Sequence, residues 1–88
     1  MKLAETIDQL LGYLSWRDSK AAIIIFNRNR NFSKVLEAIP GVMRSHQNFQ
    51  KDEGQQAPTQ FRYAFHHKDD SAKVLHITVM AFDVPQSP

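Results

Sequence analysis

Imidazole and carboxylate side chains gather in one stretch near the carboxyl end of the chain. His66 and His67 are followed closely by Asp69 and Asp70, and His76 comes shortly after them. These residue types hold a divalent ion when three or four of them converge on one point. Adjacent residues of a strand point to opposite faces, so His66 and His67 do not chelate one ion together. His66 and His76 supply at most two ligands, so we expect no metal site here and interpret Asp69 and Asp70 as turn formers.

Cationic and amide side chains alternate just before a predicted helix. Arg28, Arg30 and Lys34 are interleaved with asparagines, among them Asn31. A helix N-terminus presents N–H groups to an anion, and nearby cations strengthen that attraction. We therefore take Arg28, Arg30, Asn31 and Lys34 as candidate contacts to a phosphate group or a nucleic acid. The alternative interpretation is a solvated turn between a strand and a helix.

Other kinds of catalytic site lack their residues in this sequence. The 88 residues include no cysteine, which excludes a disulfide framework, a thiolate zinc site and a Cys-His arrangement. The three glycines are too few for a complete phosphate-cradling loop or a dinucleotide-binding fingerprint. No Ser-His-Asp arrangement is recognisable either. We expect the chain to have no catalytic residue, no cofactor and no metal ligand.

The composition is that of a small folded domain. Hydrophobic residues make up 42% and charged residues 23% of the chain, and the formal net charge is +2. This mild positive charge is compatible with a nucleic-acid partner without requiring one. The longest apolar run, residues 21–26, is too short to span a bilayer, and Glu5 and Asp8 interrupt any secretory signal. We expect one small domain over residues 1–88, a cytoplasmic location and no membrane partner.

The secondary-structure elements that would position these side chains begin with a helix and a strand. The helix has one apolar stripe, made of Leu3, Ile7, Leu10, Leu11 and Leu14. After a polar connection, residues 21–26 form an apolar run without alternation. A strand that is apolar on both faces is typical of the middle of an α/β sheet, where both faces are covered. We therefore expect this strand to be buried on both sides.

The middle of the chain predicts a second helix and a loop. The helix begins near Asn31 or Ser33 and is expected to end at Pro40-Gly41. Residues 42–49 predict a further helical turn or two. Residues 50–60 are poor in apolar side chains and are expected to form an exposed loop.

The last third of the chain predicts a β-hairpin. Apolar side chains alternate through residues 61–65 and again through residues 75–81. A one-residue slip would send one set to the other face, so a shared apolar face requires one register. In that register Phe65 pairs with Leu75, Tyr63 with Ile77 and Phe61 with Val79. The connecting turn then has three or five residues centred on Asp70.

The predicted fold is therefore α/β or α+β, with element order α-β-α-(α)-β-β. We expect a small mixed sheet of about three strands, with the antiparallel hairpin at its C-terminal end and helices packed on it. The face of the hairpin opposite the shared apolar face is mixed, so partial cover is expected there as well.

The first helix also carries Gln9-x-x-x-Tyr13, and it leads through a polar joint into the apolar strand. This arrangement resembles the second half of the restriction-endonuclease-like, or PD-(D/E)XK, nucleases over roughly residues 3–39. The resemblance implies an Asp and a Glu-x-Lys or Asp-x-Lys on two strands ahead of the helix, where they hold a divalent ion that activates water. Here only two residues precede Leu3, so we expect no catalysis by this chain alone. Asp18-Ser19-Lys20 does not replace that motif, because it follows the helix.

The expected function is that of a non-catalytic C-terminal module of a larger or degenerate nuclease of this kind. A protein-interaction or dimerisation domain is the second hypothesis, and a nucleic-acid-binding module is the third. A sheet of three strands has open edges, and proteins cover or pair such edges. We therefore expect a homodimer, or a partner chain, to form through an open sheet edge.

Overall fold

A computed structural model describes residues 3–14, 19–28, 31–67 and 72–84. The described elements are α1 (Leu3–Tyr13), β1 (Lys20–Asn27), α2 (Phe32–Ser45), β2 (Phe49–Ala57), β3 (Gln60–His66) and β4 (Val74–Asp83). The strands form one sheet in the order β1-β4-β3-β2, with β1 parallel to β4 and the other neighbours antiparallel. This combination of helices and a mixed sheet confirms the predicted fold class, with one strand more than expected.

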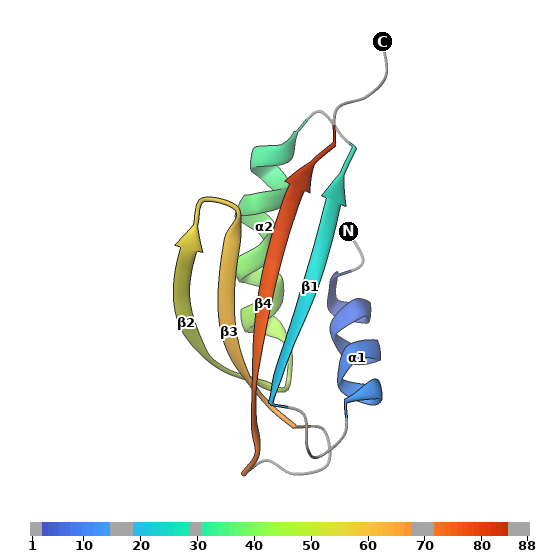
Figure 1. The fold of residues 1–88 in the computed structure, drawn as a ribbon, viewed down its shortest axis with the longest axis vertical. Coiled ribbons are helices and arrows are strands. Elements are labelled where there is room, and N and C mark those ends of the chain that lie inside the picture. The colour runs from blue at the N-terminus through green and yellow to red at the C-terminus, as the bar shows by residue number, and fades with distance from the viewer. Residues whose placement is uncertain (1–2, 15–18, 29–30, 68–71, 85–88) are drawn as a thin grey trace.

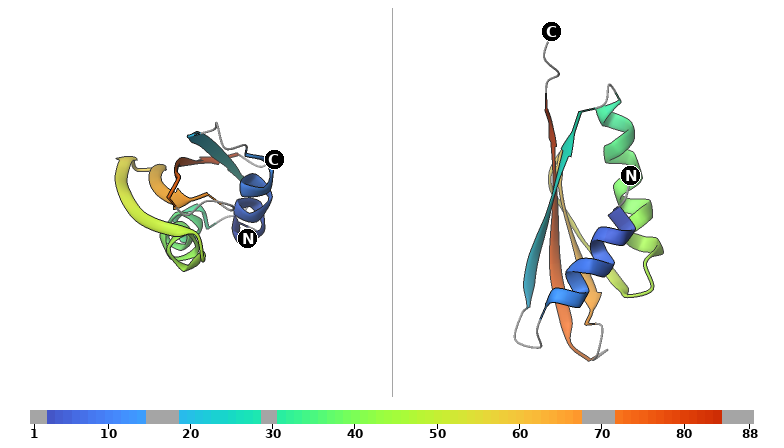
Figure 2. Two further views of the ribbon diagram at one scale, coloured as in Figure 1. Left: turned by 90° about the horizontal axis from the view of Figure 1, so that it is seen from below. Right: turned by 90° about the vertical axis from the view of Figure 1, so that its right-hand side faces the viewer.

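Both helices pack on the same face of the sheet, so the described part of the chain has two layers (Figures 1 and 2). The apolar stripe of α1 faces this interface, with Leu3, Ile7 and Leu11 buried and Leu10 and Leu14 partly buried. The core lies between the layers, where α2 contributes buried side chains and β3 and β4 contribute most of the rest. None of the described helices is long and apolar enough to cross a membrane.

The predicted hairpin register is confirmed. Phe65 pairs with Leu75, Tyr63 with Ile77 and Phe61 with Val79, and all six side chains are buried. Alternation in both strands fixed this register, because only it places both apolar sets on one face. The N–H of His67 donates to the carbonyl of Lys73 at 2.9 Å, while the predicted turn centre Asp70 lies outside the described residues.

The prediction that Pro40-Gly41 ends the second helix is wrong, since α2 continues to Ser45. Pro40 cannot donate a hydrogen bond to the carbonyl of Leu36, and such a loss usually destabilises a helix by about 3 kcal/mol. Ile39 and Met43, one helical turn apart on the same side, are both fully buried. Packing on each side of Pro40 therefore holds the helix together. Of the residues 42–49 predicted to form a further turn, 42–45 are the end of α2, 46–48 connect α2 to β2, and Phe49 already belongs to β2.

The prediction of an exposed loop at residues 50–60 is also wrong. Most of this segment is β2, which pairs with β3 through a register that shifts at three places. Gly54 has φ of 102°, a backbone conformation that favours glycine. Because β2 is an edge strand with mainly exposed side chains, it has no apolar alternation that could have predicted it.

The prediction that residues 21–26 are buried on both faces is contradicted. The strand β1 lies at an edge of the sheet, beside β4 only within the described residues (Figure 1). Its side chains alternate between exposed and at least partly buried positions, since both helices cover the same face. Its apolar outer face is therefore left without cover by the described part of the chain.

Candidate interaction surface

The strand β1 uses one side of its backbone to pair with β4. The carbonyls of Ser19 and Asn27 accept hydrogen bonds from the N–H groups of His76 and Val84, at 2.8 and 2.7 Å. Backbone groups alternate in direction along a strand, so the odd-numbered residues of β1 face β4. The even-numbered residues direct their N–H and C=O groups away from the sheet. These outward-facing residues are Lys20, Ala22, Ile24 and Phe26.

An exposed apolar strip lies on the face of the sheet opposite the helices. We define the strip as Ala22, Ile24 and Phe26 of β1 with Met80 and Phe82 of β4. Ile24, Phe26 and Phe82 are 51%, 65% and 47% exposed, which is unusual for such large apolar side chains. The rings of Phe26 and Phe82 stack with centroids 5.9 Å apart. The strip is thus continuous across the two strands.

A polar cluster continues the same face toward β2. We define the cluster as Glu53, Arg62 and His76, which come from β2, β3 and β4. A carboxylate oxygen of Glu53 lies 2.6 Å from Nδ1 of His76 and 3.6 Å from Nε of Arg62. The Glu53 side chain is only 18% exposed, so its charge is held among these two neighbours. The cluster links three strands and leaves the face polar at this side.

The predicted histidine and aspartate candidates do not converge in the described structure. His76 directs Nδ1 to Glu53, while Asp69 and Asp70 lie outside the described residues. No group of three His, Asp or Glu side chains that could hold a metal ion occurs within the described ranges.

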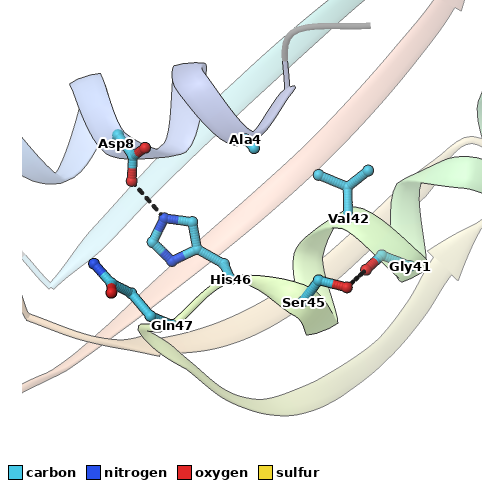
Figure 3. A pocket seen from close by; sticks show the side chains of 7 residues that line it. All are labelled: Ala4, Asp8, Gly41, Val42, Ser45, His46 and Gln47. Carbon is cyan, nitrogen blue, oxygen red and sulfur yellow. Dashed lines mark hydrogen bonds and ion pairs between the residues drawn. The ribbon is translucent and has the colours of Figure 1, made fainter.

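An Asp–His pair lies in an open depression of about 670 Å³ between α1 and the end of α2 (Figure 3). Nε2 of His46 lies 2.6 Å from a carboxylate oxygen of Asp8. Nδ1 of the same ring accepts a hydrogen bond from the backbone N–H of Asn48 at 3.0 Å, so Nε2 is the donor to Asp8. Both ring nitrogens are therefore engaged, and the nearby Ser45 hydroxyl donates to the carbonyl of Gly41. The pair ties the two helices together and leaves no ring nitrogen to act as a general base.

A second polar contact joins α2 to β2. Nε of Arg44 lies 2.9 Å from a carboxylate oxygen of Asp52, and this hydrogen bond raises the pKa of Arg44. Asp52 pairs with Tyr63 across the β2–β3 ladder. Burial raises the pKa of Tyr63, and the Asp52 carboxylate raises it further. These contacts hold the outer strand β2 against the helix layer.

Gln9 and Tyr13, on which the sequence resemblance rests, lie one turn apart on α1. Both are exposed, Tyr13 by 85%, so neither side chain contributes to the core. Of the predicted phosphate contacts, Arg28 follows β1, Asn31 precedes α2 and Lys34 lies in its first turn, and all three are exposed. Arg30 lies outside the described residues.

Sequence reasoning missed the polar cluster and the Asp8–His46 pair. The cluster requires β2, whose polar sequence gave no strand signal. Asp8 and His46 are 38 positions apart, and no local pattern connects them. The apolar residues of the strip were recognisable as apolar, but their exposure depends on which layers are present.

Comparisons with protein-family models, with curated proteins and with solved structures found no match to this chain.

Proposed function

We propose that this chain is a non-catalytic interaction module that completes its sheet with a strand supplied from outside the described residues. The observation that carries this proposal is the outer edge of β1, where alternate residues from Lys20 to Phe26 direct their backbone groups away from β4. An edge of this kind is a template for strand pairing. Eight consecutive residues of β1 pair with β4 without a register shift, so the template is regular.

The position of α1 supports a strand that is parallel to β1. α1 lies on the β1 side of the helix layer and runs in the opposite direction to β1 (Figures 1 and 2). A strand that leads into α1 and lies at the free edge of β1 would form a β-α1-β1 unit. With the helices on this face, that crossover is right-handed, as about 98% of such connections are.

The resemblance to the nucleases indicates which kind of polypeptide would supply this strand. In the PD-(D/E)XK arrangement, the helix with Gln-x-x-x-Tyr follows the strands that carry the metal-binding residues. The proposed donor is therefore a polypeptide with an Asp and a Glu-x-Lys, which would hold the metal ion, while this chain supplies α1, β1 and the sheet behind them. The exposure of Gln9 and Tyr13 leaves both side chains accessible to such a donor.

The experiment is to read the sequence encoded directly upstream of Met1 and to co-express that segment with the chain. We expect an upstream Asp followed by Glu-x-Lys, and an equimolar complex by size-exclusion chromatography with light scattering. Ala22→Pro should abolish the complex, because it removes an outward-facing N–H while the bonds to β4 use Ala21 and Ile23. Ala22→Val keeps that N–H and should retain the complex. An upstream sequence without these residues would overturn the nuclease origin of the donor, and a complex that Ala22→Pro leaves intact would overturn pairing through the β1 edge.

A second copy of this chain is the alternative donor, and the symmetry of the β1 edge favours it. The four outward-facing residues are centred on Ile23, so two copies can pair antiparallel with Lys20 opposite Phe26 and Ala22 opposite Ile24. Light scattering on the chain alone separates the two donors. A mass near twice 10.1 kDa that Ala22→Pro halves would assign the edge to a homodimer.

A further inference from the structure

The face of the sheet opposite the helices has two chemically different halves. The half over the parallel strands β1 and β4 carries the apolar strip toward the C-terminal ends of both strands. The half over the antiparallel strands β3 and β2 carries Glu53 and Arg62 of the polar cluster, which meet His76 at the beginning of β4, together with Lys51, which is paired with Ala64. Parallel strands are normally covered on both faces, whereas antiparallel strands often leave one face to solvent. The apolar half is therefore the half that requires a second layer.

We propose that the apolar strip is the docking site of one amphipathic α-helix with acidic flanks, contributed by a partner polypeptide. This inference rests on the proposed function, in which the chain completes its fold with polypeptide from outside, and it names the element that covers the face. With this helix docked, the parallel half of the sheet would be covered on both faces, as the apolar sequence of β1 favours.

The width and length of the strip match those of a single docked helix. Two neighbouring strands lie about 4.8 Å apart, so the strip with its side chains is roughly 10 Å wide, close to the diameter of one α-helix. From Ala22 to Phe26 the strip extends over about 13 Å, which corresponds to roughly nine helical residues. A β-strand laid across this face would leave its own backbone groups unpaired, since the backbone of β1 and β4 bonds within the plane of the sheet.

The charges around the strip favour acidic residues on the flanks of the incoming helix. Lys20 is exposed at one end of the strip on β1, His76 of β4 pairs with it there, and Arg62 lies close by on the neighbouring strand β3. Among the described residues of this face, Lys20, Lys51 and Arg62 are opposed by one carboxylate, that of Glu53. Among the described residues, the helix side of the molecule has the reverse balance, with Glu5, Asp8 and Glu37 of the helices and Asp52 of β2 against Lys34 and Arg44 of α2. Acidic residues beside the apolar stripe of an incoming helix would be attracted to this face and repelled by the other.

Single-stranded nucleic acid would meet the same positive balance, and aromatic rings on a sheet face can stack with bases. The observations favour a helix because Ile24, Ala22 and Met80 fill the space between the cations and the two rings with aliphatic side chains.

The test is a titration of the full chain, ¹⁵N-labelled, with a synthetic helical peptide of about 18 residues, long enough to be helical in water. The peptide carries leucines at positions i, i+3, i+4 and i+7 with glutamates on both flanks. We expect NMR shift changes at residues 22–26 and 80–82 and little change in α1 and α2. A scrambled peptide of the same composition should not bind. A peptide with lysine flanks should bind several-fold more weakly, and that difference should shrink as salt is raised.

Single substitutions test whether the peptide binds at the strip. Phe82→Ser should weaken binding of the peptide about tenfold or more, because it removes a large apolar contact. Tyr13→Ser is the matched control, since Tyr13 is an exposed aromatic residue on the helix side, and it should leave affinity within about twofold. Ile24→Thr is a second strip variant in case Phe82→Ser perturbs the fold. Equal binding of the scrambled peptide, or equal effects of Phe82→Ser and Tyr13→Ser, would overturn the inference.

Two further experiments distinguish helix docking on the strip from strand pairing at the β1 edge and from binding of nucleic acid. Phe82→Ser should weaken peptide binding while it leaves strand pairing intact, because Phe82 belongs to β4 and not to the free edge of β1, so loss of either result identifies which proposal fails. A fluorescent oligo(dT) in place of the peptide should not bind at physiological salt. Binding of that oligonucleotide that Phe82→Ser weakens and salt abolishes would assign the strip to single-stranded nucleic acid instead and would overturn the helix.

Discussion

The two outer strands of the sheet present their edges in different ways. β2 carries Lys51, Asp52 and Glu53 in succession, contains Gly54 in a left-handed backbone conformation and shifts register against β3 at three places. Charges and bulges of this kind prevent unwanted pairing. β1 has one charged residue, Lys20, and a register with β4 that runs without a break. The difference indicates that the β2 edge is protected and that the β1 edge is suited to pairing.

The largest expected effect tests whether the two sides of the β1 backbone differ as described. Ile23→Pro removes an N–H that faces β4 and a side chain that is 5% exposed, so it should destabilise the fold by about 3 kcal/mol or more. Ala22→Pro removes an outward-facing N–H and should cost far less, about 1 kcal/mol or below. Urea denaturation followed by circular dichroism gives both free energies of unfolding. Equal destabilisation by the two prolines would mean that the assignment of inward and outward residues is wrong.

The next effect concerns the irregular edge. Gly54 has φ of 102°, so Gly54→Val should destabilise the chain by about 1–2 kcal/mol through backbone strain. Gly41→Ala is the matched control, because its new Cβ would meet open space inside α2. This control should stabilise the chain by about 0.5–1 kcal/mol. If Gly54→Val is neutral in thermal denaturation, the bulge is not the fixed feature that protects β2.

The same contrast explains how far the sequence predicted the fold. The pairing of β3 with β4 was predictable residue by residue, since alternation in both strands allows one register only. β2 was not predictable, because an exposed edge strand needs no apolar side chains and its backbone pairing leaves no mark on residue type. The failure at Pro40 has a similar cause, since the buried contacts of Ile39 and Met43 come from tertiary packing.

β1 shows a different kind of failure. Its unbroken apolar sequence correctly indicated a strand, but the predicted burial on both faces is contradicted, because the described residues cover only the face on which the helices pack. A sequence pattern reports the environment for which a strand is suited. Which polypeptide supplies that environment is a separate question, and the sequence of the strand does not contain the answer.

A smaller effect should follow from giving β1 the kind of charge that β2 already has. Ile24→Lys places a cation at an outward-facing position that is 51% exposed, so the free energy of unfolding should change by only about 0.5 kcal/mol. Strand pairing at the edge should nevertheless weaken, because charges on an edge oppose association. Sedimentation velocity with the strand donor, or with the chain alone if it dimerises, measures this loss. Retention of full association would show that the contact does not involve the β1 edge.

The smallest effect concerns the buried contact between Tyr63 and the neighbouring strand β2, and it appears only at high pH. Burial and the nearby Asp52 carboxylate raise the pKa of Tyr63, so the folded state favours the neutral phenol more than the unfolded state does. Stability from this preference is complete below the pKa of an unfolded tyrosine, about 10, and is lost as the pH rises through the higher pKa of the folded state. Tyr63→Phe should therefore flatten the fall in the free energy of unfolding at alkaline pH, measured by urea denaturation at a series of pH values. Tyr13→Phe controls for removal of a phenol, and equal flattening by both variants would mean that the buried contact between Tyr63 and β2 does not set the alkaline response.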